Sequence, residues 1–375
     1  MFSLQSNNGL ARRGEVKTAH GTIQTPFFMP IATRASVKSL SSEDVRDLGA
    51  QIVLSNTYHL LLRPGFDGMK QFRGLHQFMN WNGPILTDSG GYQVFSLGKM
   101  RDIDDDGVDF QSHIDGRKIR LTPEGSMAMQ QVIGADMIMQ FDDVAPGNSS
   151  RERYKEAMER SLKWAKRCKD SYNQDQKLFA IVQGGTHEDL RAASAEALVD
   201  IGFDGYAIGG LSVGEARDDA FRISKFIAGQ LPKEQPRYFM GGGMPEEIVY
   251  YVSVGIDMFD CVLPTRNARH GTLFLWKSDP AAAVKEAFDR AQNGANDEQI
   301  AEVLYEKIQI TREDMSFDTS AIDALGGIKS SETYTKAYLR HLFKTGELLA
   351  FRLATQQNLG FYLRLMRELR GIISA

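Results

Sequence analysis

Eight short apolar segments constrain the fold of this chain most strongly. They lie at residues 26–31, 52–56, 84–88, 136–142, 178–183, 205–209, 237–241 and 258–263. Each is rich in residues that favour β-strands, each ends in a polar or glycine-containing loop, and a helix-like stretch follows most of them. Continuous rather than alternating hydrophobicity is typical of strands buried on both faces, as in a parallel sheet covered by helices. Eight such units predict an α/β fold of the TIM (β/α)8 barrel type.

An open doubly wound sheet is the alternative architecture. Such sheets often carry a G-x-G-x-x-G fingerprint, and the run Gly241-Gly242-Gly243 lacks that spacing. Two segments interrupt the barrel pattern: residues 98–122 predict a hairpin after the third strand, and from about residue 275 helices dominate. The predicted C-terminal helices cover residues 280–293, 297–308, 332–353 and 356–373. We therefore expect an irregular barrel in residues 1–274, with an N-terminal or inserted hairpin, and a C-terminal helical subdomain in residues 275–375.

Composition excludes several classes of protein. The chain has 375 residues, of which 42% are hydrophobic and 25% charged, as in a globular protein with a sizeable core. It contains neither a run of 18 apolar residues nor a secretory leader, so we expect a cytoplasmic protein with no membrane partner. Cys168 and Cys261 are too few for a disulfide framework or a thiolate metal cage. The net charge of −4 gives no global sign of nucleic-acid binding, although residues 329–370 form a locally basic run.

Polar side chains follow several of the predicted strands. Asp88, Asp142, Gln183 and Asp260 each lie at or just after a strand end. Reactive groups of a TIM barrel lie at the C-terminal ends of its strands, so we expect these side chains around one mouth. Two aspartates on separate strands suit a two-step displacement at a sugar carbon, in which one attacks C1 and the other moves a proton. The other two side chains suit hydrogen bonding to the edge of a planar heterocycle, so the residues indicate glycosyl transfer or hydrolysis.

Longer motifs resemble those of the queuine/guanine tRNA-ribosyltransferases, also called tRNA-guanine transglycosylases. They lie at residues 25–30, 55–60, 87–94, 182–185, 208–215 and 257–266, the last reading Asp-Met-Phe-Asp-Cys-Val-Leu-Pro-Thr-Arg. The similarity runs from about residue 10 to 274 and resumes from about 334 to 370, with a length like that of the bacterial branch. The resemblance implies an irregular TIM barrel with a helical subdomain. It also implies a pentosyltransferase of tRNA processing that replaces the wobble guanine (position 34) of tRNAs with GUN anticodons by a 7-deazaguanine such as preQ1, in queuosine biosynthesis.

The resemblance also implies roles by position. Asp260 would be the nucleophile on the ribose C1′, forming a covalent intermediate, and Asp88 the general acid and base. The implied substrate-binding and tRNA-binding residues are Asp142 and Gln183 for the base edge, Gly210 and Leu211 for backbone contacts, Tyr92 and Met240 for stacking, and Arg266 and Arg269 for tRNA. Val213 matches the bacterial pattern, whereas Val144 stands where many bacterial members have cysteine, so the incoming base stays open.

The resemblance fails at the zinc site that the family carries in its C-terminal subdomain. The positions of its C-x-C-x₂-C motif and its distant histidine hold Gly326, Ile328, Ser331 and Gln357. None of these residues offers a thiolate or an imidazole, so we predict no metal and no cofactor. Our hypothesis is that added helical sequence in residues 275–325 supplies the order that the metal gives relatives. The resemblance implies a homodimer formed partly by this same subdomain, and because the subdomain differs here the oligomeric state stays open.

Three other functions stay open beside the active tRNA enzyme. They are a non-catalytic tRNA-binding partner subunit, a transglycosylase acting on DNA, and an unrelated barrel glycosidase. Loss of a catalytic aspartate would indicate the first, and both Asp88 and Asp260 are present. The closeness of the motifs and the intact Thr265-Arg266 argue against DNA, and a glycosidase would leave Asp142 and Gln183 unexplained.

Overall fold

A parallel sheet of eight strands forms the centre of the computed structural model, which describes residues 2–97, 99–212 and 214–374. Its order is β4-β14-β13-β12-β11-β10-β6-β5. The strands are β4 (Phe27–Met29), β5 (Val53–Ser55), β6 (Ile85–Thr87), β10 (Met137–Met139), β11 (Lys177–Val182), β12 (Gly205–Ile208), β13 (Arg237–Phe239) and β14 (Met258–Asp260). Just beyond β4, Ile31 bridges to Leu54 of β5 and the Ala32 N–H donates to the Leu54 carbonyl at 2.6 Å, so the sheet nearly closes. The predicted α/β barrel and all eight predicted strands are confirmed.

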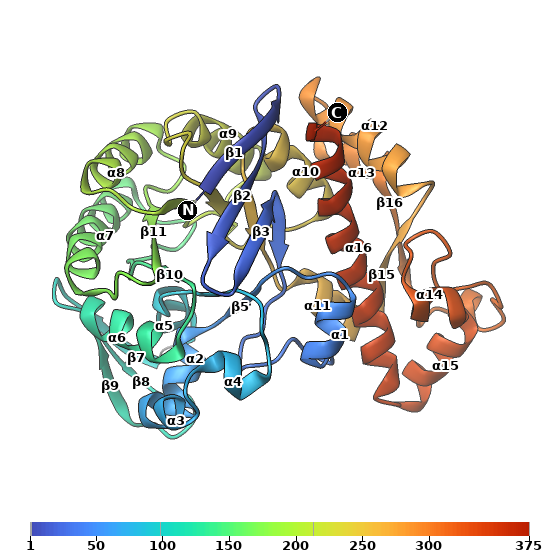
Figure 1. Ribbon diagram of the computed structural model, residues 1–375, viewed down its shortest axis with the longest axis horizontal. Coiled ribbons are helices and arrows are strands. Elements are labelled where there is room, and N and C mark those ends of the chain that lie inside the picture. The colour runs from blue at the N-terminus through green and yellow to red at the C-terminus, as the bar shows by residue number, and fades with distance from the viewer. Residues whose placement is uncertain (1, 98, 213, 375) are drawn as a thin grey trace.

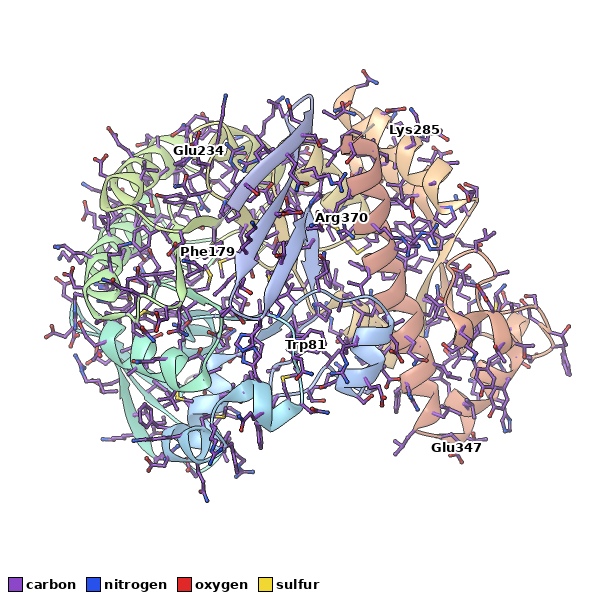
Figure 2. The ribbon with its side chains drawn as sticks, in the orientation of Figure 1. Trp81, Phe179, Glu234, Lys285, Glu347 and Arg370 are labelled. Atoms are coloured by element: carbon purple, nitrogen blue, oxygen red, sulfur yellow. The ribbon has the colours of Figure 1, made fainter. Side chains whose placement is uncertain are left out.

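Alternate residues of each strand face the two sides of the sheet. Met137 and Met139 of β10 belong to a core cluster that also contains Phe27, whereas Ile138 between them packs into the larger cluster beneath the helices. Both sides are buried, which explains why the strands read as continuous apolar runs. Figure 2 shows the side chains of Phe179 and Trp81 within the body of the molecule, with Lys285 and Glu347 at its edge.

Helices cover the outside of the barrel. The longer ones are α6 (Pro123–Ile133), α7 (Arg151–Ser171), α8 (Glu188–Ile201), α9 (Arg217–Ala228) and α10 (Pro245–Ser253). Shorter helices, α1 (Ser42–Asp47), α2 (Thr57–Leu62), α3 (Gly65–Gln71), α4 (Leu75–Met79), α5 (Gly91–Leu97) and α11 (Leu263–Arg269), lie in the connections. Side-chain caps fix where several begin: the Ser150 hydroxyl accepts from the Arg153 N–H at the start of α7.

Two three-stranded antiparallel sheets flank the barrel. At the N-terminus, β1 (Phe2–Asn8), β2 (Ala11–Thr18) and β3 (Gly21–Thr25) form one, and its Val16 and Ile23 join the core inside the barrel. The insertion forms the other from β7 (Lys99–Ile103), β8 (Val108–Gln111) and β9 (Lys118–Leu121), one strand more than the hairpin predicted there. This second sheet docks on α7, where the Trp164 indole N–H donates to the Asp105 carbonyl at 2.7 Å.

The C-terminal region departs from two of the predicted helices. It contains α12 (Pro280–Gln292), α13 (Asp297–Leu304), η1 (Glu313–Met315), α14 (Lys329–Thr333), α15 (Lys336–Thr345) and α16 (Leu349–Ser374). The helix predicted at 297–308 is wrong at its end, because residues from Tyr305 onward form β16 (Tyr305–Gln309), which pairs antiparallel with β15 (Thr272–Trp276). The helix predicted at 332–353 is interrupted because Gly346 adopts a left-handed conformation, φ 76°, and caps α15.

Helix α16 joins this region to the barrel. Figure 1 shows it as the red helix between the sheet β1–β3 and the helices α12 to α15. Its Arg370 guanidinium donates to the Pro26 carbonyl at 2.8 Å, and its Asn358 amide donates to the carbonyls of Pro264 and Thr272 at 3.1 and 2.9 Å. Strand β15 spans the predicted boundary at residue 274, and the division into 1–274 and 275–375 stays a prediction.

None of the helices in the described ranges combines the length and apolar character needed to cross a membrane.

Candidate active site

A cavity of about 750 Å³ lies at the C-terminal ends of the barrel strands. Its wall contains the predicted site residues Asp88, Tyr92, Asp142, Gly210, Leu211, Met240, Asp260 and Arg266. Two predicted residues, Gln183 and Arg269, are not part of the wall as far as the described residues define it. Segments that are far apart in sequence therefore meet here because parallel strands end at the same rim of the barrel.

Asp260 is the last residue of β14 and its carboxyl group is buried. One oxygen, Oδ1, accepts hydrogen bonds from the Tyr238 hydroxyl at 2.5 Å and from the Gly241 N–H at 3.0 Å. Burial raises the pKa of Asp260, and these two hydrogen bonds oppose that rise. The donors therefore favour the ionised carboxylate and fix its orientation towards the cavity.

Asp88 follows β6 and is held by the start of α2. The Thr57 N–H donates to its Oδ1 at 2.9 Å, and the Asn56 side-chain amide donates to its Oδ2. Burial, followed by the charges of Asp260 and Asp142, raises the pKa of Asp88 to about 7, against the opposing hydrogen bonds from backbone N–H groups. A carboxyl group with such a pKa can give and take a proton near neutrality.

Asp142 follows β10 and is supported from behind by Gln183. The Gln183 amide donates to Asp142 Oδ2 at 2.7 Å, and the Ser89 hydroxyl donates to Oδ1 at 3.4 Å. Burial and the neighbouring Asp143 raise the pKa of Asp142 to about 7, while the Gln183 hydrogen bond lowers it. A side chain at Gly210, φ 63°, would bring its Cβ within 2.4 Å of the Gln183 Oε1 atom, so glycine keeps this carboxamide in place.

The other predicted residues contribute surfaces rather than reactive groups. Tyr92, at the start of α5, is 51% exposed, and Met240 follows β13 on another side of the wall. Arg266 is exposed on α11 at the rim, whereas Arg269 on the next turn is partly buried. Val144 also lines the wall, while Val213 lies outside the described residues.

Sequence reasoning missed the residues that hold the aspartates. Tyr238 lies within an apolar strand and reads as an ordinary core aromatic, so nothing local reveals its contact with Asp260. Asn56 gave a signal, because it follows a strand and precedes a helix. Its side-chain oxygen Oδ1 accepts from the His59 N–H at 3.0 Å and so caps α2. His59 itself lines the cavity, and burial, with the nearby charge of Arg34, lowers its pKa to about 4.

The positions of the family's zinc ligands are filled by packed protein atoms. The Gln357 amide donates to the Phe274 carbonyl at 2.8 Å and to Asp323 Oδ2 at 2.9 Å. Ile328 and Ser331 are buried, and Gly326 packs against the Trp276 ring. With an amide already engaged and no thiolate or imidazole among the four positions, these residues do not fit a zinc ion.

The chain is similar to known proteins over almost its whole length. The family model described as queuine tRNA-ribosyltransferase matches residues 6–375. A queuine tRNA-ribosyltransferase of Dechloromonas aromatica is 47% identical, over 99% of this chain and 94% of the relative. Proteins of the same name from Idiomarina loihiensis and Halothermothrix orenii are each 46% identical, over 100% and 98% of this chain and 93% and 91% of their own lengths.

Proposed function

Because the chain belongs to the queuine tRNA-ribosyltransferase family, we propose that it acts as a tRNA-guanine transglycosylase. In this proposal it replaces guanine at wobble position 34 of tRNAs with a GUN anticodon by a 7-deazaguanine such as preQ1. The observation that carries the proposal is the set of three carboxyl groups, Asp88, Asp142 and Asp260, around one cavity, of which Asp142 and Asp260 are buried and Asp88 is partly buried. Their different hydrogen-bond partners suit three different tasks.

The first half of the exchange breaks the bond between the ribose and guanine. The Asp260 carboxylate attacks C1′ and forms an ester bond to it as the C1′–N9 bond breaks. The electron pair of that bond leaves with the guanine, which takes a proton from Asp88. The raised pKa of Asp88 supports this assignment, because a carboxyl group whose pKa is about 7 is still protonated in a substantial fraction of molecules at neutral pH.

The second half runs the same chemistry in reverse with a new base. Asp88, now a carboxylate, takes a proton from the incoming base, whose N9 attacks C1′. The ester bond to Asp260 breaks, and its electron pair returns to the carboxylate. The hydrogen bonds from Tyr238 and Gly241 favour this leaving group, because they stabilise negative charge on Asp260.

Asp142 is suited to reading the base edge, and Gln183 acts through it. The Gln183 amide holds Asp142 Oδ2 from behind, so Asp142 presents its carboxyl group to the cavity in one orientation. Backbone groups of Gly210 and Leu211 add polar contacts, and Tyr92 and Met240 offer surfaces for stacking the base. A flipped-out base needs both edge hydrogen bonds and stacking partners.

Arg266 is placed to bind a phosphate of the anticodon loop. Its side chain is exposed at the rim of the cavity, and guanidinium groups pair well with phosphate. Arg269 lies one turn further along α11, outside the wall, and we assign it a contact with a neighbouring nucleotide.

A homodimer remains part of the proposal, and light scattering of the purified protein tests it.

We also propose that the C-terminal subdomain keeps its order without zinc. The hydrogen bonds of Gln357 and the buried side chains of Ile328 and Ser331 support this. Activity and tRNA binding should then survive a zinc chelator unchanged. Loss of tRNA binding on chelation, restored by added zinc, in the wild type and equally in His20→Asn would overturn the zinc-free subdomain while leaving the exchange reaction standing.

Base exchange on defined transcripts tests the function. The purified protein is incubated with labelled preQ1 or guanine and a tRNA transcript carrying a GUN anticodon, next to the same transcript with guanine 34 changed to adenine. We expect label only in the first transcript and none with Asp260→Asn. tRNA binding without label would favour the non-catalytic subunit, and label in a matching DNA hairpin but not in tRNA would favour the DNA-directed enzyme.

A further inference from the structure

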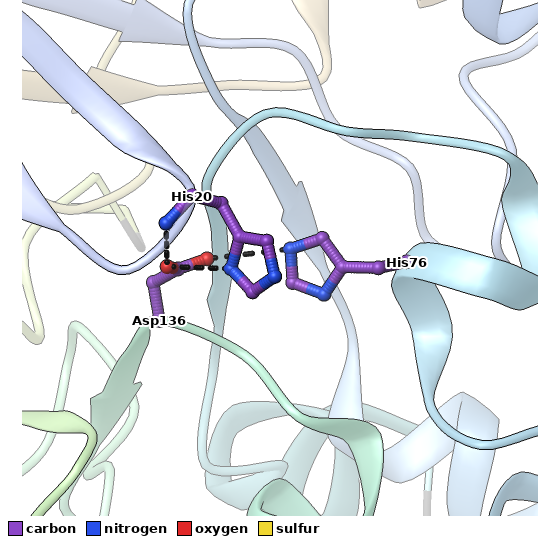
Figure 3. A group of neighbouring side chains, drawn as sticks. All are labelled: His20, His76 and Asp136. Atoms are coloured by element: carbon purple, nitrogen blue, oxygen red, sulfur yellow. Dashed lines mark hydrogen bonds and ion pairs between the residues drawn. The ribbon is translucent and has the colours of Figure 1, made fainter.

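A second cluster of titratable groups lies at the other end of β10 from Asp142. His20 in the turn between β2 and β3, His76 on α4, and Asp136 just before β10 converge there (Figure 3). His20 Nδ1 lies 2.9 Å from Asp136 Oδ1, and His76 Nε2 lies 3.3 Å from Asp136 Oδ2. The exchange reaction uses none of these groups, and they come from three segments that are distant in sequence.

The carboxylate of Asp136 is held in place before any ligand arrives. Besides the histidines, the backbone N–H groups of His20 and Ile85 donate to it at 3.1 and 2.9 Å. Burial raises the pKa of Asp136, but the hydrogen bonds from His76 and His20 outweigh burial and lower it to about 2. The group is therefore an oriented anion at neutral pH, with its side chain only 1% exposed.

Two imidazole nitrogens and one carboxylate oxygen are a donor set that zinc and related divalent ions favour. One such atom from each residue lies within 4.8 Å of the others. Zinc bonds of about 2.0–2.2 Å place neighbouring tetrahedral ligands roughly 3.3 Å apart. The distance from Asp136 Oδ1 to His20 Nδ1 is 2.9 Å, and that from Asp136 Oδ2 to His76 Nε2 is 3.3 Å. Both distances are close to that spacing.

One side chain has to turn for all three donors to reach the same ion. The two imidazole rings are stacked, 3.7 Å between centroids and 20° between planes, so their in-plane lone pairs run side by side. His76 is 14% exposed and packed, whereas His20 is 41% exposed in a surface turn. His76 and Asp136 therefore form the fixed half of the site, and rotation of His20 completes it. His76 Nε2 also lies 3.1 Å from the Gly83 carbonyl oxygen. The ion replaces the proton that this nitrogen directs to Gly83 and Asp136, and the proton that His20 Nδ1 donates to Asp136.

We propose that His20, His76 and Asp136 bind one divalent transition-metal ion of the zinc class, with water completing the coordination. The site joins the β2–β3 turn to α4 and to the start of β10. It lies at the N-terminal end of the barrel strands, away from the cavity, so the bound ion stabilises the fold rather than taking part in base exchange. It is also separate from Gly326, Ile328, Ser331 and Gln357, the positions of the family's zinc ligands.

Calorimetric titration of tag-free, full-length protein with zinc chloride tests this site, and cobalt(II) absorption reports its coordination. The double variant His20→Asn, His76→Gln is the most informative, because each amide keeps an N–H for Asp136 but lacks the imidazole lone pair. His341→Gln removes an exposed histidine from α15 and is the matched control. We expect one zinc per chain and a zinc-dependent rise in Tm for the wild type and the control. Binding by the double variant should be at least ~10-fold weaker.

Two results would overturn the site: no zinc binding by the wild type, or equal binding by the double variant and the wild type. The Tm of the double variant without zinc shows whether it folds normally. If it does not fold, the single variant His20→Asn decides the question, because His20 is the exposed ligand and its loss should weaken zinc binding in the same direction.

Discussion

At the residue scale, the two aspartates assigned to the chemistry differ in what surrounds them. Asp260 accepts from a phenol hydroxyl and a backbone N–H, which stabilise its negative charge. Asp88 shares the cavity wall with two other carboxyl groups, Asp142 and Asp260, and burial with their charges raises its pKa to about 7. The same side chain can thus serve as nucleophile at one strand end and as acid and base at another.

Removing the Tyr238 hydroxyl should weaken Asp260 as a nucleophile. In Tyr238→Phe the pKa of Asp260 rises, because a hydrogen bond to the carboxylate is lost. Since the ionised form attacks, the low-pH limb of kcat/KM should move to higher pH. A hydrogen bond to a charged group contributes about 1.5–3 kcal/mol, so kcat/KM should fall roughly 10- to 150-fold. Tyr206→Phe, which loses a buried hydroxyl far from any catalytic carboxyl group, should retain the wild-type profile.

The protonation of Asp88 predicts how kcat/KM changes at high pH. Guanine release needs the protonated carboxyl group, whose pKa is raised to about 7, so kcat/KM for tRNA should fall as pH increases above about 7. Measuring kcat/KM from pH 5 to 9 checks this. Asp142 has a similar pKa, and Asp142→Asn separates the two groups. If the limb disappears in that variant, Asp142 rather than Asp88 is the group that titrates.

At the element scale, a buried hydrogen-bond network stands beside Gly326, Ile328, Ser331 and Gln357, the positions at which the sequence resemblance places zinc ligands. Asp323 Oδ2 accepts from the backbone N–H of Trp276 at 3.2 Å and from the side-chain amide of Gln357 at 2.9 Å. Asp323 Oδ1 accepts from the backbone N–H of Leu325. The network links β15, the loop before α14, and α16. It thus connects the same segments that a four-ligand metal site at residues 326, 328, 331 and 357 would connect.

Truncating Asp323 should therefore destabilise the protein. Asp323→Ala leaves the backbone N–H of Trp276 and one of the two N–H groups of the Gln357 amide without an acceptor, which costs roughly 1–3 kcal/mol in the free energy of unfolding. Urea unfolding followed by circular dichroism measures this loss. Asp314→Ala, at an exposed aspartate that pairs with Arg312, should change the free energy of unfolding by no more than ~0.5 kcal/mol. Equal stabilities of the two variants would contradict the role of the network.

The barrel strands were predictable because burial on both faces leaves a continuous apolar run, as Met137 to Met139 show. Strand β16 was not, because Tyr305–Gln309 carries exposed charges and gains its strand form only by pairing with β15. The ends of the predicted strands likewise indicated Asp88 and Asp260 as site residues. The role of Tyr238 as a hydrogen-bond donor to Asp260 is visible only in the three-dimensional structure. Contacts such as that between His20 and Asp136, 116 residues apart, leave no local pattern.

At the scale of the whole molecule, α16 packs against both the barrel and the C-terminal region, so the stability of each region depends on the other. Its Phe361 and Tyr362 belong to the main core, and the Tyr362 hydroxyl donates to the Gly243 carbonyl, in the cavity wall, at 2.6 Å. The C-terminal helix therefore supports a loop of the candidate active site directly.

A chain cut at residue 274 should fail to fold into a stable barrel. It loses α16 and the partner strand of β15, and exposes the apolar surfaces that they cover. Expression of residues 1–274 should give aggregated protein, or soluble protein without a cooperative thermal transition in circular dichroism. A soluble fragment with a Tm near that of the full chain would show that the barrel is independent of the C-terminal region.

The covalent bond between Asp260 and the ribose is the central claim, and a denaturing gel tests it most directly. The protein is incubated with labelled GUN-anticodon tRNA, denatured, and separated with and without proteinase treatment. The wild type should give a slowly migrating, proteinase-sensitive tRNA band, and Asp260→Asn should give none while still binding tRNA before denaturation. A band of equal strength in Asp260→Asn, or base exchange by the wild type through no trappable adduct, would contradict Asp260 as the nucleophile.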